Sequence, residues 1–356
     1  MPVSEVNDLK TGVNIHGVRI NVTSNNPKLV AYAGEHMGGL TTEPTIKPDI
    51  EVHCEWSVGD WEPEANPFET NGQTHIYGKR MLGQNNDLIW LNTLRMKGLK
   101  LRFQREGSVL KFHVDYCYHP KKEREGLDYE YKRYFSLMSY MIYYPLFWYL
   151  ENFRGWTLMH ASALETEHGG VMIGGLGGIG KTTTCIALIQ HANAKLISEN
   201  IIFTDGQKLY PCYEPIRLNP DSIEMLSENF QGLRKMNYPE GLKDKSMYHI
   251  NTESLPTSVP AKALFMPSFS PTRYVKPYDT KKCAEKMAAA NRLTREIDDY
   301  YWYASALEML WPKEGQSALR GAVMHKLAET AACYELGIDR NAGVEAVVED
   351  IMNSIK

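Results

Sequence analysis

Residues Met172–Gln190 read MIGGLGGIGKTTTCIALIQ and contain two overlapping nucleotide-binding patterns. From Gly175 to Thr182 the stretch matches G-x-x-x-x-G-K-[ST], the pattern of a P-loop that holds the phosphates of a nucleoside triphosphate. From Gly175 to Gly180 it also matches G-x-G-x-x-G, the glycine pattern of a dinucleotide site. The first pattern indicates phosphoryl transfer or hydrolysis, whereas the second indicates hydride chemistry.

The two residues after the last glycine favour the P-loop. In a P-loop, backbone N–H groups and the positive end of a helix surround the β-phosphate. A lysine then reaches the β and γ oxygens, and the next hydroxyl binds Mg²⁺. Lys181 and Thr182 occupy these two places. A dinucleotide site needs an acid further on to hold a ribose hydroxyl, and Glu199 could serve, but that alternative leaves Lys181 without a role.

The composition is that of an ordinary globular protein. The chain of 356 residues is long enough for two domains with a substantial core. Its residues are 43% hydrophobic and 23% charged, as is usual for globular proteins. The net charge of −4 gives no reason to expect nucleic acid or an anionic membrane as a partner. The six cysteines show no C-x-x-C spacing, and the first twelve residues contain no apolar run, so we expect a cytoplasmic protein with reduced thiols and no signal peptide.

One stretch, Tyr134–Leu150, is uncharged over its whole length. A membrane-spanning helix needs about 20 apolar residues, and this stretch is shorter and contains several tyrosines. It also contains Pro145, which removes one helical hydrogen bond and bends a helix. We therefore expect a buried, proline-kinked helix here rather than a membrane span.

The sequence pattern divides the chain into four parts. Apolar residues alternate with polar ones early in the chain, which indicates strands, and later segments have longer apolar stripes that indicate helices. In chain order we expect a β-rich domain (1–126), a connecting apolar helix (127–155), an α/β nucleotide-binding domain (156–312) and a helical tail (313–356).

Four stretches between Trp156 and Leu218 resemble the catalytic domain of HPr kinase/phosphorylase and related proteins: LMHASALE, the glycine-rich stretch, AKLISENIIF and LYPCYEPIRL. These relatives are bacterial serine kinases with a fold close to that of phosphoenolpyruvate carboxykinase. The resemblance implies an α/β P-loop domain that binds ATP and Mg²⁺. It further implies phosphorylation of a hydroxyl on a protein, peptide or small molecule, and makes a homo-oligomer an expected assembly.

The resemblance also implies roles for individual residues. It assigns the nucleotide to Gly175, Gly177, Gly178, Ile179, Gly180, Lys181, Thr182, Thr183 and Arg217. Lys181, Glu199 and His160 are the expected catalytic residues, with Glu199 in the position of the family's catalytic base. The expected metal ligands are Thr182, Glu199, Asn200 and Glu214.

The chain departs from the family at one point. Two adjacent aspartates of the family correspond here to Glu199 and Asn200. An amide oxygen can bind Mg²⁺ but contributes no charge. A nucleotide-binding module without turnover therefore stays open beside a kinase, and His160, which lies in a strand-like stretch, could equally be a core residue.

Overall fold

The computed structural model describes residues 9–60, 75–78, 81–84, 86–91, 96–120, 129–225, 233–236, 246–312 and 316–356. They form a mixed α/β structure that divides into two compact units. Among these residues, the first unit takes those up to Trp148 and those from Tyr300 to 312, and the second takes the rest. Residues 300–312, which we expected in the nucleotide-binding domain, therefore belong to the first unit. The expected boundary near residue 126 lies outside the described residues.

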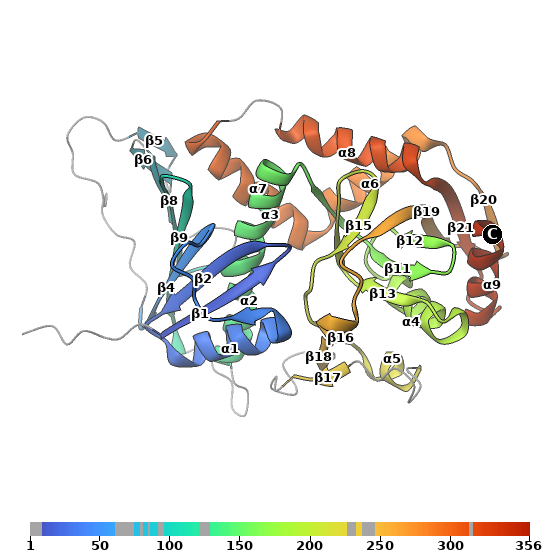
Figure 1. Ribbon diagram of the computed structural model, residues 1–356, viewed down its shortest axis with the longest axis horizontal. Coiled ribbons are helices and arrows are strands. Elements are labelled where there is room, and N and C mark those ends of the chain that lie inside the picture. Colours follow the sequence, from blue (N-terminus) through green and yellow to red (C-terminus); the bar gives the residue numbers. More distant parts are fainter. Residues whose placement is uncertain are drawn as a thin grey trace, which may run out of the picture. The chain divides into compact units, whose positions relative to one another are not determined.

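The first unit is built on one sheet whose strands follow the order β3-β1-β2-β4-β9-β8-β7-β6-β5 (Figure 1). β4 is parallel to both β2 and β9, and the other pairs are antiparallel. Buried and partly exposed residues alternate along the strands, as expected for a sheet with one face in the core and the other toward solvent. The strands are β1 (Leu9–Ile15), β2 (Val18–Ser24), β3 (Thr41–Thr42), β4 (Ile50–Val58), β5 (His75–Gly78), β6 (Met81–Gln84), β7 (Asp87–Leu91), β8 (Leu99–Glu106) and β9 (Val109–Tyr118).

The first unit also contains a helix that the alternating pattern did not predict, α1 (Pro27–Met37). The Asn26 side chain accepts hydrogen bonds from the backbone N–H groups of Lys28 and Leu29, and Pro27 occupies the first helical turn. An Asn–Pro pair is a recognised start signal for a helix, because asparagine caps it and proline fixes the first φ angle. This helix packs against β1 and β2.

The uncharged stretch is helical and buried, as expected. It lies within three consecutive helical segments: α2 (Tyr129–Met138), a π-helical turn η3 (Ser139–Tyr143) and α3 (Tyr144–Arg154). The irregular turn lies directly ahead of Pro145, whose ring disturbs the preceding turn of a helix. Within the part of the chain that the structure describes, no helix is both long and apolar enough to cross a membrane.

The second unit contains a mixed sheet in the order β10-β14-β15-β19-β12-β11-β13, with β21 beside β19 and β20 beside β21. β12, β19 and β21 are parallel to one another. The strands are β10 (Thr157–His160), β11 (Ser162–Thr166), β12 (Gly169–Ile173), β13 (Lys195–Ser198), β14 (Ile201–Thr204), β15 (Lys208–Pro211), β19 (Val259–Phe269), β20 (Tyr274–Pro277) and β21 (Ala332–Ile338). A small separate sheet contains β16 (Ile216–Leu218), β17 (Leu233–Lys235) and β18 (Ser246–Ile250).

The C-terminal tail is not wholly helical, which corrects the expectation from sequence. α8 (Gln316–Thr330) and α9 (Val344–Ile355) flank β21, which pairs in parallel with β19. A short apolar run cannot be assigned to a helix or a strand by periodicity alone, and this run follows α8 with one residue between them. The partner strand, which is distant in sequence, decides its conformation.

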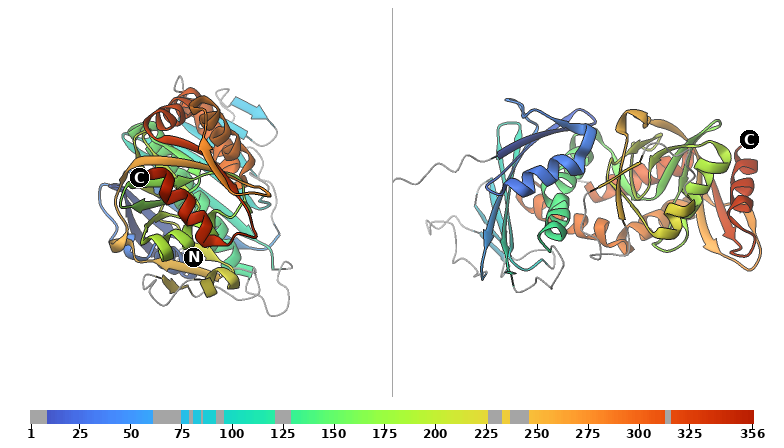
Figure 2. Two further views of the ribbon diagram at one scale, coloured as in Figure 1. Left: turned by 90° about the vertical axis from the view of Figure 1, so that its right-hand side faces the viewer. Right: turned by 90° about the horizontal axis from the view of Figure 1, so that it is seen from below.

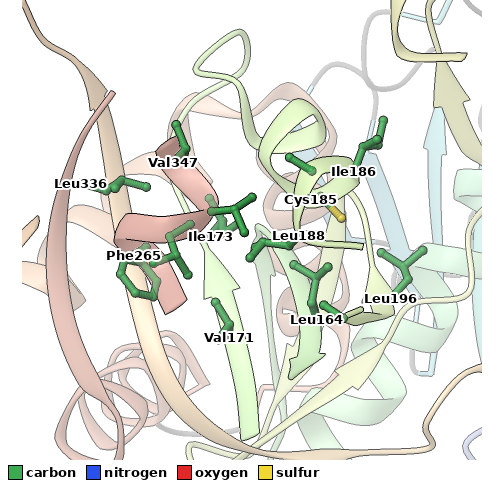
Figure 3. Packing of buried hydrophobic residues seen from close by; sticks show 14 of the residues in the cluster. Leu164, Val171, Ile173, Cys185, Ile186, Leu188, Leu196, Phe265, Leu336 and Val347 are labelled. Atoms are coloured by element: carbon green, nitrogen blue, oxygen red, sulfur yellow. The ribbon is translucent and has the colours of Figure 1, made fainter. Parts of the chain in front are cut away.

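Helices cover both faces of the second unit's sheet (Figures 1 and 2). α4 (Lys181–Ala192) and α9 pack on one face, and α6 (Thr280–Leu293) and α8 pack on the other. β12 contributes Val171 and Ile173 to the first layer, where Leu188 and Val347 also lie (Figure 3), and Met172 to the second. Because β12 is buried on both faces, the loop that follows it starts from a firmly held strand.

Candidate functional site

The glycine loop, defined here as Gly174–Gly180, connects β12 to α4 and so has the strand–loop–helix context expected from sequence. Gly175, Gly178 and Gly180 have φ angles of 106°, 81° and 88°. Residues with a side chain rarely adopt such angles, so the backbone itself requires glycine at these three positions. The backbone N–H of Gly174 donates to the Phe265 carbonyl at 2.9 Å, which ties the start of the loop to β19.

Lys181 is the first residue of α4, and only 7% of its surface is exposed. Its Nζ donates to the carbonyl oxygens of Gly175 at 3.0 Å and of Leu176 at 2.9 Å, so the amine lies inside the curve of the glycine loop. Burial lowers the pKa of Lys181 to about 8, against the opposing effect of the nearby Glu199 carboxylate. Lys181 therefore loses its proton, and with it its positive charge, at mildly alkaline pH.

Thr182 and Glu199 contact each other directly. The Thr182 hydroxyl donates to Glu199 Oε1. Glu199 and Asn200 form the bend between β13 and β14. Residues that follow β10 hydrogen-bond to the backbone of this bend. There the Ser162 hydroxyl donates to the Glu199 carbonyl at 2.5 Å, and the Ala161 N–H donates to the Asn200 carbonyl at 3.1 Å. A hydroxyl and a carboxylate are thereby brought together at the first turn of α4.

His160 ends β10 and is held on both sides. Its backbone N–H donates to Asn291 Oδ1 at 2.9 Å, and its ring Nδ1 lies 2.6 Å from the Thr294 hydroxyl. A further side-chain hydrogen bond joins it to Asn200. Burial and the positive charge of Lys181 lower the pKa of His160 to about 4, so the imidazole is neutral at neutral pH.

Asn200 and Glu214 bond to each other. The Asn200 amide nitrogen donates to Glu214 Oε1 at 2.6 Å. Burial raises the pKa of Glu214 to about 7, while Arg217 and the bond from Asn200 act in the opposite direction. Arg217 lies on β16, with Nη2 at 3.5 Å from Glu296 Oε1. The site therefore carries a second carboxyl group, which titrates close to neutral pH.

Most of the side chains described so far line, or directly contact the lining of, one pocket of about 280 Å³. It brings together most of the residues singled out in the sequence: Gly177, Gly178, Gly180, Lys181, Thr182, Thr183, His160, Glu199, Asn200 and Arg217. Gly175, Ile179 and Glu214 are not among its lining residues, although Gly175 accepts from Lys181 and Glu214 accepts from Asn200.

The sequence did not point to Asn291, Thr294, Glu296 or Asn219, the last of which lines the pocket. Asn291 carried a usable signal. It is almost fully buried on the side of α6 that also buries Met287, and a polar residue on an apolar helix face must find a hydrogen-bond partner. Its amide nitrogen donates to the Leu158 carbonyl at 2.8 Å, so it fixes β10 on both sides of Met159.

The donor set suits a magnesium ion that shares a phosphorylated ligand. Mg²⁺ in such sites is bound by one or two protein oxygens and completes its shell with phosphate oxygens and water. The Thr182 hydroxyl and the Glu199 carboxylate supply oxygens of this kind next to the helix N-terminus. Within the described residues, no group of three or more His, Cys, Asp and Glu side chains is arranged to hold a metal ion by itself.

Comparisons with known proteins give a weak structural likeness and no match in sequence. No family model matches the chain. No curated protein matches it in sequence. Among solved structures, the Hpr(Ser) kinase/phosphatase from Coxiella burnetii matches with a TM-score of 0.28 and 10% identity, over 56% of this chain and 95% of that protein. A likeness at this TM-score carries no argument about the chemistry of the site.

Proposed function

We propose that this chain is a P-loop phosphotransferase that binds ATP with Mg²⁺ at the glycine loop and transfers the γ-phosphoryl group to a hydroxyl. The observation that carries the proposal is the pairing of Thr182 with Glu199 at the first turn of α4, beside Lys181, in a pocket that His160 and Arg217 also line. Cations, a helix N-terminus and a paired hydroxyl and carboxylate are the groups that phosphoryl transfer uses.

The glycine loop fits a chain of phosphates. Around Gly177 the structure leaves open space where a Cβ would lie, so a ligand can approach the backbone N–H groups closely. Lys181 would exchange its two carbonyl partners for β and γ oxygens, and its positive charge would stabilise the charge that builds there during transfer. Mg²⁺ on Thr182 and Glu199 would neutralise phosphate charge.

The proton of the acceptor hydroxyl would pass to Glu199. A general base contributes on the order of 10²–10⁴-fold, and less where the transition state is loose and the proton leaves late. His160 is neutral at neutral pH, so it would position Asn200 or the acceptor by hydrogen bonding rather than bind phosphate as a cation. The acceptor itself, whether a protein, a peptide or a small molecule, is a matter for a substrate screen.

The proposal is tested by measuring ADP formation from ATP and Mg²⁺, with and without candidate hydroxyl acceptors. We expect turnover to be lost in Lys181→Met and to fall by about 10²-fold or more in Glu199→Gln, with ATP binding retained in the second variant. Calorimetric binding on the same samples separates the two effects. A Lys181→Met variant that phosphorylates at the normal rate would remove this site from the reaction.

A second candidate function is a nucleotide-binding module that does not turn over. The observation favouring it is the hydrogen bond from Asn200 to Glu214. Asn200 stands where the resembled family has an aspartate, and its amide is occupied by this bond. Glu199 is then the one carboxylate of the pair, and it bonds to Thr182. ATP binding without ADP formation in the native protein, together with a gain of ADP formation in Asn200→Asp, would establish this candidate.

The dinucleotide alternative receives less support from the topology. A dinucleotide fold places the strand after the first helix directly beside the first strand and parallel to it. Here β11 lies between β12 and β13 and is antiparallel to both. Glu199 bonds to Thr182 instead of standing free at a strand end for a ribose. Titration with NAD is the direct check.

A further inference from the structure

A second pocket, of about 330 Å³, lies against the glycine loop on the side of α9. It shares Gly178, Gly180 and Thr183 with the pocket described above, so the two adjoin across the same few residues. Each is near the lower end of the size range of small-molecule sites, about 300–1,000 Å³. One extended ligand can therefore occupy both.

The sheet explains why this pocket stands where it does. β12, β19 and β21 are parallel, so their carboxyl ends meet at one edge, where ligands of α/β sheets bind. β12 ends at Ile173 and turns into the glycine loop, while β19 continues past it to Phe269. Phe269 pairs with Ile338 at the end of β21. The ends of the two longer strands thus form a wall beyond the glycine loop.

The wall has the chemistry of a site for a flat aromatic group. Phe269 is 47% exposed, so this large apolar side chain at the end of β19 is accessible to a ligand. The guanidinium of Arg340 lies over its ring at 5.3 Å. Val344 and Val347, from the first turns of α9, complete an apolar lining. The walls of the adjoining pocket, in contrast, are mainly charged and polar side chains.

Asp339 adds a hydrogen-bond acceptor at the edge of this lining. Its Oδ1 accepts from the Asn341 N–H at 2.9 Å, and its carbonyl accepts from the Ala342 N–H at 3.1 Å. These bonds fix the turn between β21 and α9. A carboxylate held in this way suits an exocyclic amino group, such as that of adenine.

We propose that the pocket formed by Phe269, Arg340, Asp339 and the start of α9 binds the base of the nucleotide whose phosphates lie on the glycine loop, with the base stacked on Phe269. This rests on the proposed function, since it assumes a nucleoside triphosphate at the loop. It assigns a binding role to the C-terminal β21–α9 segment, which the sequence presented only as part of a tail.

The test compares ATP with inorganic tripolyphosphate, which has the phosphates and no base, by calorimetry in the presence of Mg²⁺. The variants are Phe269→Ala, Phe269→Trp as the control that keeps an aromatic face, and Lys181→Met as the control for the phosphates. Loss of one stacked base weakens binding about 5- to 160-fold. We expect Phe269→Ala to lose affinity for ATP by that factor, with affinity for tripolyphosphate unchanged, and Phe269→Trp to bind ATP as the native protein does.

The two proposals fail in different ways. If the native protein binds ATP and tripolyphosphate equally, or if Phe269→Ala binds ATP normally, the base site is overturned while the phosphate site stands. If Lys181→Met binds both probes normally, or if the native protein binds neither, the phosphate site is overturned and the base site falls with it. Melting temperatures of the Phe269 variants check that the fold is intact, which we expect for a half-exposed side chain.

Discussion

The pH dependence of ATP binding is the sharpest consequence of the site, because Lys181 is buried and its pKa is lowered to about 8. Phosphate oxygens would raise this pKa in the complex, so binding above pH 8 takes up a proton and affinity falls as pH rises. With a free-state pKa of about 8, half of the lysine is protonated at pH 8 and about 3% at pH 9.5. The affinity should therefore fall about 16-fold over this range, or about 1.6 kcal/mol.

Calorimetric titrations at constant ionic strength, in buffers of different ionisation enthalpy, measure both the affinity and the proton uptake. The pKa of His160 is about 4 and that of Glu214 about 7, so at pH 8 the imidazole is fully neutral and Glu214 is already about 90% ionised. Neither group therefore produces a change of about 16-fold above pH 8. Lys181→Met should bind ATP more weakly at every pH and show no slope above pH 8. A constant affinity of the native protein between pH 8 and pH 9.5, or an equal slope in Lys181→Met, would refute the reasoning.

Further predictions concern the neighbours of this lysine and the core beneath it. Thr182→Val should raise the Mg²⁺ concentration needed for half-maximal ATP turnover, and an unchanged metal titration would exclude its hydroxyl as a ligand. Thr294→Val removes the bond to His160 Nδ1, so it should lower turnover at nearly constant KM for ATP, whereas a purely structural bond would change only the melting temperature. The folded-state pKa of Glu214 is raised, so the free energy of unfolding should fall by on the order of 1–3 kcal/mol between pH 5 and pH 7.5. Urea titrations at both pH values measure this fall, and Glu214→Gln should not show it. Ile173→Ala should cost about 2–5 kcal/mol of unfolding free energy, since this side chain is fully buried, and a loss below 1 kcal/mol would contradict the packing in Figure 3.

The parts of the fold that the sequence predicted are those fixed by local signals. The strand, glycine loop and helix around Lys181 follow from glycines that adopt positive φ angles and from an apolar run on each side. The turn between β14 and β15 carries a local signal of the same kind, since Asp–Gly pairs favour turns and Gly206 has a φ of 86°. β21 was not, because its conformation depends on pairing with β19, about seventy residues earlier in the chain, and nothing in its own residues records that partner.

The site was predictable to the extent that its residues lie in a pattern of fixed spacing. The loop residues were identified from their spacing and Glu199 from the family resemblance. The structure brings Glu199 into one pocket with most of the loop residues. Thr294 was not identified, because it is far from His160 in sequence and the bond forms only after α6 packs beside β10. Phe269 ends the apolar strand β19, and periodicity does not reveal that the last residue of a strand extends beyond the core and is exposed.

The amide at Asn200 has a physical consequence that a comparison of residue types alone does not reveal. Its nitrogen is a donor to Glu214 at 2.6 Å, and Glu199 lies next to it in the chain. An aspartate at this position would offer only acceptors to Glu214, and two carboxyl groups at this distance hold one proton between them. Glu214 already has a pKa of about 7, with Arg217 as the cation that lowers it, so a third carboxylate would be neutralised by protonation rather than add charge to the site. Asparagine thus keeps the carboxylate on Thr182 as the negative charge nearest the glycine loop, and the Asn200–Glu214 bond serves to position that bend.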